Sequence, residues 1–279
     1  MMTFQYFYKI ETFNKKVYIL PEKNATKKTI SITENIDDIL VDTLNLGKKQ
    51  YFEENITNDE LLEYFSKYGL FGFMIDLAIN KYFVLDEKVA VRDPFYINFK
   101  ENINLMNTTE YLKFFFPELN KKEINQIIKK CKDYVNETTK ENYITSTINE
   151  YLIYSEYYAE PLEMILNYAR SLYKSLALAV ENKFLNMQLP FLSINHLSHN
   201  FHDFYYKNNF AFTMNYLKQS VDTYYAMQMG QDTRLLKLCN FCDNAFIAKN
   251  PKAEYDTYNC KNKANVYKSR KRVVSKNVI

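Results

Sequence analysis

Apolar residues near the N-terminus of this chain alternate or cluster as they do in short β-strands. Residues 4–11 and 16–20 are rich in aromatic and β-branched side chains, and the residues between them can turn, so we predict a β-hairpin. Residues 82–91 and 95–99 show the same character and predict a second strand pair. Most of the remaining chain follows the helical period.

Two early helices are predicted from apolar residues that recur every three or four positions. The first covers about 36–46 and is expected to end at Gly47, and the second covers about 58–68 and is expected to end at Gly69. Thr57 lies three residues before Glu60, the spacing of a capping box at the start of the second helix. The chain has only 4 glycines, so Gly69 and Gly72, close together, indicate a forced backbone conformation or a close helix approach.

The second half of the chain is predicted to be almost wholly helical. Asn120 and Glu123 have the spacing of another capping box, and Cys131 lies on the apolar stripe of the helix that follows, so we interpret it as a core residue. Pro161 suits the first turn of a helix that runs to about 187. A further helical stretch is expected over about 195–229.

Charge divides the chain unequally. Residues 237–276 contain ten basic and three acidic side chains, whereas the whole protein has a net charge of only +3. The remainder is therefore mildly acidic, and the basic C-terminal segment is expected to face a polyanion. We divide the chain into a mixed, mostly helical body over 1–233 and a small basic module over 234–279.

The C-terminal module contains the clearest chemical motif. Cys239 and Cys242 form a Cys-x2-Cys pair, the usual first half of a zinc ribbon, and Cys260 is the obvious third ligand. Asp256 stands four residues before Cys260, where another cysteine would be expected, and a carboxylate oxygen can also bind zinc. We predict one zinc ion per chain, with two alternatives: a site in which Asp256 is not a ligand, or a degenerate module without metal. The fold class is therefore α+β, predominantly helical, with N-terminal hairpin elements and a small C-terminal zinc-ribbon-like module.

The segment from Cys239 through Phe246 and the run from Cys260 to Arg272 resemble the C-terminal zinc ribbon of bacterial Cys-Gly-Asn-Arg zinc-finger proteins. They also resemble related uncharacterised proteins of low-GC Gram-positive bacteria and their mobile elements. Cys260-Lys-Asn-Lys stands at the signature, and Asp256 stands where those relatives have a cysteine. The resemblance covers about forty residues and implies a DNA-binding or regulatory role.

A basic run follows Cys260 and is the predicted nucleic-acid contact. Its side chains would neutralise phosphates, which gives strongly salt-dependent binding of DNA or RNA. The alternative is a helix that only carries solvated charge. The predicted contact residues are Lys261, Lys263, Lys268, Arg270, Lys271 and Arg272.

The three histidines of the chain, His196, His199 and His202, lie within seven residues. On a helix they would share one broad face and could hold a second metal, as in a metal-dependent hydrolase. We favour a structural or partner-facing role for them. The chain contains no glycine-rich phosphate loop and no Gly-x-Ser-x-Gly motif, so we do not expect an enzyme.

The favoured function is thus nucleic-acid binding, in a regulatory role, by a cytoplasmic protein. The first alternative is an interaction protein from a phage or mobile element that docks on a host nucleoprotein complex. The second is the histidine-centred hydrolase. No apolar stretch approaches the roughly 20 residues of a membrane span, and four cysteines, three of them in the module, do not suggest a disulfide framework.

Overall fold

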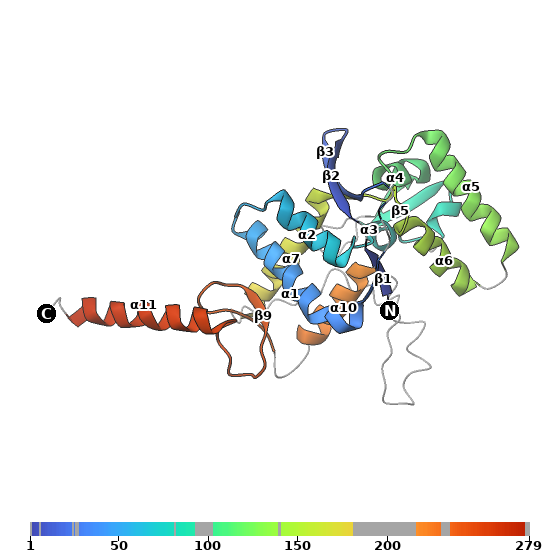
Figure 1. Cartoon of the computed structure of the whole chain (residues 1–279). Helices are drawn as coiled ribbons and strands as arrows, with labels where there is room; N and C mark the ends of the chain where they lie inside the picture. The colour runs from blue at the N-terminus through green and yellow to red at the C-terminus, as the bar shows by residue number, and fades with distance from the viewer. Residues whose placement is uncertain are drawn as a thin grey trace, which may run out of the picture.

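A computed structural model describes residues 2–5, 7–23, 25, 28–80, 82–92, 103–138, 141–180, 216–229 and 235–276. The chain is a mostly helical α+β protein with an N-terminal hairpin and a small C-terminal β-hairpin (Figure 1). The predicted fold class is confirmed. Within the described ranges, no helix has both the length and the apolar content that a bilayer span requires.

The N-terminal strands differ in detail from the prediction. The hairpin consists of β2 (Tyr8–Phe13) and β3 (Lys16–Pro21), which turn at Asn14 and Lys15 with positive φ angles of 48° and 68°. The short strand β1 (Met2–Gln5) is separate and pairs with β4 (Lys28–Ser31) instead. The prediction of a single strand over 4–11 was therefore wrong, because the two halves of this segment pair with different strands.

The centre of the body is a helix pair, α1 (Ile32–Tyr51) and α7 (Leu162–Val180). The prediction that the first helix ends at Gly47 was wrong, because α1 continues through Gly47 to Tyr51. A Cβ atom at Gly47 would lie 2.0 Å from the carbonyl oxygen of Ala169 in α7. This glycine therefore lets the two helices approach closely and does not terminate the first one.

The capping predictions are confirmed. Helix α2 (Asn58–Tyr68) begins with the Thr57–Glu60 capping box, and Gly69 follows it with φ 82°. Helix α5 (Lys121–Glu137) begins with the Asn120–Glu123 box and buries Cys131.

The middle of the chain forms a smaller layer of short elements beside α5 (Figure 1). Strand β5 (Lys88–Arg92) pairs with β6 (Ile103–Asn107), and the predicted partner strand 95–99 lies outside the described residues. The start of the predicted strand 82–91 was wrong, because η1 (Phe83–Leu85) is a 3-10 turn. The remaining helices here are α3 (Phe73–Leu77), α4 (Thr108–Phe115) and α6 (Glu141–Ile153).

A buried carboxylate fixes the glycine-containing segment before α3. Glu160 accepts hydrogen bonds from the backbone N–H groups of Phe71 (2.9 Å), Gly72 (2.6 Å) and Phe73 (2.9 Å). Gly72 has φ 83°, and a Cβ there would lie 2.6 Å from Cβ of Tyr216, so the forced conformation predicted for this glycine is confirmed. Glu160 and Pro161 form β7 (Glu160–Pro161), which pairs with β3, so Pro161 precedes α7 and is not in its first turn.

Helix α10 (Leu217–Met229) contributes a buried ion cluster to the same core. The Lys218 ammonium lies 2.5 Å from a carboxylate oxygen of Asp222 and 2.9 Å from one of Asp76. Tyr168 donates a 2.8 Å hydrogen bond to the other oxygen of Asp222. Burial without these partners would cost several kcal/mol per charge, so each group depends on the others.

Candidate metal centre

The C-terminal hairpin consists of β8 (Leu236–Leu238) and β9 (Ala245–Ile247), and the turn between them carries two of the cysteines. The N–H of Cys239 donates to the carbonyl of Asn244 (2.8 Å), and the N–H of Asp243 donates back to the carbonyl of Cys239 (2.9 Å). Asp243 takes a positive φ of 61° to close this turn. The Cys-x2-Cys segment therefore forms a tight knuckle at the end of the hairpin.

The other two side chains of the site come from the start of helix α11 (Tyr258–Lys276). Thr257 accepts a hydrogen bond from the N–H of Cys260 through its hydroxyl (3.2 Å), which places Cys260 in the first turn of the helix. Asp256 lies just before that turn. The connecting loop is held to the knuckle by the N–H of Asn240, which donates to the carbonyl of Glu254 (3.0 Å).

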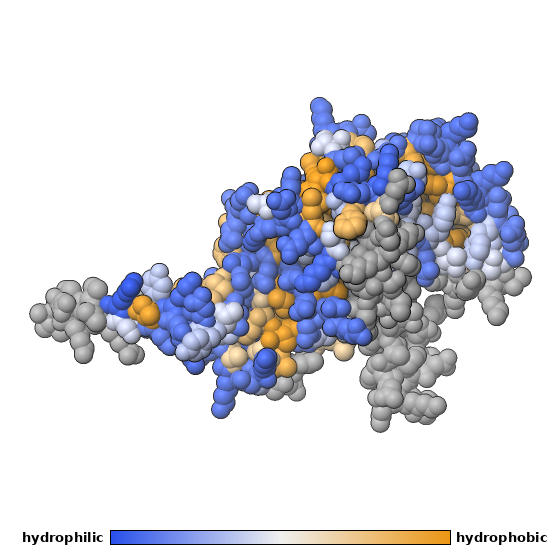
Figure 2. Space-filling view, viewed as in Figure 1, coloured by the Kyte–Doolittle hydropathy of each residue, from blue (hydrophilic) through white to orange (hydrophobic). Residues whose placement is uncertain are grey.

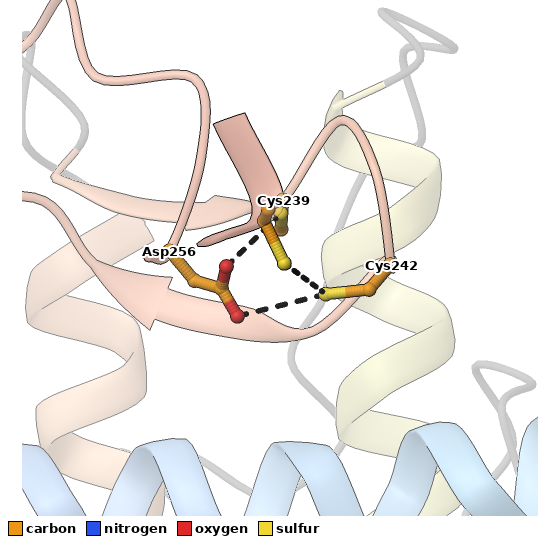
Figure 3. Close-up of side chains that lie close together, drawn as sticks. Cys239, Cys242 and Asp256 are labelled. Carbon is orange, nitrogen blue, oxygen red and sulfur yellow. Dashed lines mark hydrogen bonds between the residues drawn. The ribbon is translucent and has the colours of Figure 1, made fainter. Parts of the chain in front are cut away.

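Four side chains converge on one point. Cys239, Cys242, Asp256 and Cys260 each offer one ligand atom, and these atoms all lie within 4.8 Å of one another. Figure 3 shows the Asp256 carboxylate directed toward the sulfurs of Cys239 and Cys242. The predicted constellation is thus assembled, although it comes from two segments separated by a loop.

Three of the separations between these side chains are close to the edges of a tetrahedral metal site. With zinc–sulfur bonds of about 2.3 Å and zinc–oxygen bonds of about 2.0 Å, tetrahedral edges are about 3.8 Å between sulfurs and about 3.5 Å between sulfur and oxygen. The Sγ atoms of Cys242 and Cys260 are 3.7 Å apart. Oxygens of Asp256 lie 3.3 Å from Sγ of Cys239 and 3.5 Å from Sγ of Cys242. This cluster could hold a metal ion such as zinc.

The side chains of the cluster also influence one another's protonation. Burial raises the pKa of Cys242 to about 12, helped by the neighbouring cysteines. Burial acts to raise the pKa of Asp256 as well, but hydrogen bonds from Cys260, Cys239 and Cys242 outweigh it and lower the pKa. A bound divalent cation would displace the thiol protons, because it takes thiolates as ligands.

The knuckle rests on the body. Asn45 in α1 accepts a hydrogen bond from the N–H of Ala245 (2.7 Å) and donates one to its carbonyl (3.2 Å). Lys48 donates to the side chain of Asn244 (3.0 Å), and the hydroxyl of Tyr173 in α7 donates to the carbonyl of Asp243 (2.9 Å). Three side chains of the central helix pair therefore hold residues 243–245, which follow directly after the second knuckle cysteine.

These contacts were not predicted from the sequence, although one signal was present. Asn45 is a polar residue between Leu44 and Leu46, both of which are buried in the core. Leu236 and Ala245 of the hairpin belong to the same apolar cluster. The predicted domain boundary between residues 233 and 234 falls within a stretch, 230–234, that lies outside the described residues, and it remains a prediction.

Helix α11 extends away from the rest of the molecule and carries the C-terminus at its far end (Figure 1). Lys261, Lys263, Lys268 and Arg270 are all exposed on it. The backbone of the helix continues through Lys271 and Arg272, but their side chains lie outside the described part of the structure. On the face seen in Figure 2, the described side chains of this helix are mainly hydrophilic.

The predicted second site is not part of the described structure. His196, His199 and His202 all fall within 181–215, which lies outside the described residues. The hydrolase alternative therefore stays untested.

Comparison of the chain with protein-family models, with curated proteins and with solved structures finds no match in any of the three. The likeness to the Cys-Gly-Asn-Arg ribbons therefore remains a resemblance of the C-terminal segment. The function has to be inferred from the residues of the cluster and the helix that follows it.

Proposed function

We propose that this chain is a nucleic-acid-binding protein in which one zinc ion, held by Cys239, Cys242, Cys260 and Asp256, anchors a basic helix to the helical body. The observation that carries the proposal is the position of Cys260. It belongs both to the metal cluster and to the first turn of α11, so a bound metal would fix the base of the basic helix.

The role of the metal would be structural. All four candidate positions of a tetrahedral site are taken by protein side chains, which is typical of a closed structural centre and leaves no open place for substrate. The loop of residues 248–257 has little regular structure of its own, so metal binding would supply much of the free energy that orders it.

The charge of the helix supports a polyanionic partner. Lys261, Lys263, Lys268 and Arg270 are exposed, and no ion pair within the described residues joins any of them to a carboxylate. Unneutralised cations on a projecting helix can each displace a counterion from a phosphate, and this release is the main source of nucleic-acid affinity at low salt.

The test compares two charge variants of the full-length, zinc-loaded protein. One variant changes the four α11 cations to glutamine: Lys261, Lys263, Lys268 and Arg270. The matched control changes four exposed lysines of α5 to glutamine: Lys121, Lys122, Lys129 and Lys130. Both variants lose the same net charge, and both are titrated against fluorescent duplex and single-stranded nucleic acids at several salt concentrations.

We expect the α11 variant to bind much more weakly than wild type. The slope of log affinity against log salt should become shallower by about 0.9 for each duplex phosphate that the helix no longer neutralises. The α5 variant should retain most of the wild-type affinity and slope. Equal weakening in both variants would mean that only net charge matters, and unchanged binding by the α11 variant would contradict the proposal.

A further inference from the structure

Helix α11 has two chemically different faces, and its contacts identify which one is turned inward. Cys260 contributes to the metal cluster, Ala264 is buried, and the ring of Tyr267 packs on that of Phe241 in the knuckle at 5.8 Å between centroids. Positions 260, 264 and 267 are related by steps of four and three residues, so they form one stripe. This stripe faces the metal module.

The opposite stripe carries short polar side chains. Asn262, Asn265 and Ser269 are spaced three and four residues apart and lie about half a turn from the inward stripe, since a helix advances about 100° per residue. All three are exposed. None of them has a hydrogen-bonding partner within the described residues that would explain an amide or hydroxyl at these positions.

Basic side chains border this polar stripe on both sides. Lys261 and Lys268 are seven residues apart and share one flank, while Lys263 and Arg270 are also seven apart and share the other. All four are exposed. The order across the outer surface is therefore cations, amides and hydroxyl, then cations again.

We infer that α11 is a recognition helix for duplex DNA, which lies in the major groove and reads base edges through Asn262, Asn265 and Ser269. This inference rests on the proposed function and specifies its ligand. The two cationic flanks would contact the phosphates of the two strands that border the groove, which positions the helix without reading sequence.

The dimensions and chemistry agree with this ligand. A helix of 19 residues is about 28 Å long and, with its side chains, about 10–12 Å wide, which fits a B-form major groove about 12 Å across. Asparagine forms a bidentate pair with the N6 and N7 atoms of adenine in that groove. The exposed Val266 lies beside the amides and offers an apolar contact for a thymine methyl group. The preferred site should therefore contain A·T pairs.

Other nucleic acids suit this surface less well. The major groove of A-form RNA is deep and narrow, so a whole helix does not enter it. Single strands are usually bound by several aromatic platforms that line a basic groove. Helix α11 projects as a single helix and forms no such groove, although Tyr258 and Tyr267 are exposed on it and Tyr267 also contacts Phe241. The arrangement of amides between two cationic flanks favours a duplex DNA groove.

The experiment begins with selection from a library of random DNA duplexes by the full-length, zinc-loaded protein. Affinities are then measured for the selected duplex, a scrambled duplex, the single strand and the RNA duplex of the same sequence. The test variant is Asn262→Ala with Asn265→Ala, and the matched control is Asn125→Ala, an exposed asparagine in α5.

We expect the selected duplex to contain A·T pairs and to bind more tightly than the RNA or single-stranded forms. The double variant should lose about ten- to hundredfold in affinity for the selected duplex and retain its affinity for the scrambled one. Retained binding to the scrambled duplex also shows that the variant is folded. The Asn125 variant should behave as wild type.

Three results would count against the inference in distinguishable ways. Tighter binding to RNA or single strands would reject the duplex major groove and leave the proposed function intact. Equally reduced affinity for selected and scrambled duplexes, or no reduction at all, would reject base reading by the two asparagines. An absence of binding to every nucleic acid would overturn the proposed function itself.

Discussion

Asn45 and Ala245 exchange two hydrogen bonds across 200 residues of sequence: the N–H of Ala245 donates to the amide oxygen of Asn45 at 2.7 Å, and the amide nitrogen donates back to the carbonyl at 3.2 Å. One side chain of α1 thus completes the backbone hydrogen bonding at the first residue of β9. Because the knuckle cysteines lie just before this residue, the body helps to shape the metal cluster.

Replacement of Asn45 by alanine should weaken both stability and metal binding. The variant leaves the N–H of Ala245 without its partner, which costs about 1–3 kcal/mol in free energy of unfolding. It should also hold zinc more weakly, because the turn that presents Cys242 loses an anchor. Denaturant unfolding and competition with a zinc chelator measure the two effects. Asn125→Ala serves as control, and a stable Asn45→Ala variant with unchanged zinc affinity would show that the knuckle does not depend on α1.

The close approach of α1 and α7 gives a second prediction. In a solvent-exposed helix, a Gly→Ala substitution would stabilise the helix by about 1 kcal/mol, because alanine has the higher helix propensity. Here the new Cβ meets the Ala169 carbonyl at 2.0 Å, so the two helices must move apart and the variant should be strongly destabilised. Thermal unfolding measures the change, with Gln50→Ala, one turn later in α1, as the control for propensity alone. A higher melting temperature for Gly47→Ala would contradict the packing.

The buried ion cluster should make stability depend on pH. Burial raises the pKa of Asp222 to about 6, although Lys218 opposes the shift, whereas an unfolded aspartate titrates near pH 3.9. A raised native pKa means that this group's contribution to stability is fully present below about pH 4 and is lost as pH rises through about 6.

Asp222→Asn should remove that dependence. The free energy of unfolding of wild type, measured relative to the variant, should therefore fall between about pH 4 and pH 7, by at most about 3 kcal/mol. Urea unfolding across this range provides the measurement, and Asp133→Asn, an exposed position in α5, is the control. A difference that stays constant or grows with pH would show that the native pKa of Asp222 is not raised.

The local features of this fold were predictable because their causes are local. The capping boxes of α2 and α5 and the buried position of Cys131 follow from a few neighbouring residues. Gly47 was wrongly predicted to be a helix end because its role depends on Ala169, more than a hundred residues away. The same is true of β1, which pairs with β4 and not with the strand that follows it.

The candidate metal site was predictable in its ligands and not in its surroundings. Cys-x2-Cys spacing identifies a knuckle, and Cys260 and Asp256 complete the set. No local pattern indicates that Asn45, Lys48 and Tyr173 hold the turn, since these contacts join segments far apart in sequence. The two faces of α11 became distinguishable only when the contacts of Ala264 and Tyr267 were known.

Asp256, the fourth side chain of the cluster, should influence how tightly the metal is held. Asp256→Cys would complete a four-cysteine site, and it should release zinc to a chelator more slowly than wild type because zinc favours thiolate ligands in closed sites. Asp256→Asn should release it faster. Glu254→Gln, an exposed acidic position two residues earlier, is the matched control. The Glu254→Gln control should release zinc at the wild-type rate. If Asp256→Asn also releases zinc at that rate, Asp256 is not a ligand.

The most direct test of the metal-anchored helix is native mass spectrometry of the purified full-length chain, which counts zinc ions per protomer. We expect one zinc in wild type and none in Cys239→Ser or Cys260→Ser. A second zinc that survives both substitutions would assign a metal to other residues, with the three histidines as first candidates. A wild-type chain that carries no zinc, even after purification with the metal present, would contradict the account.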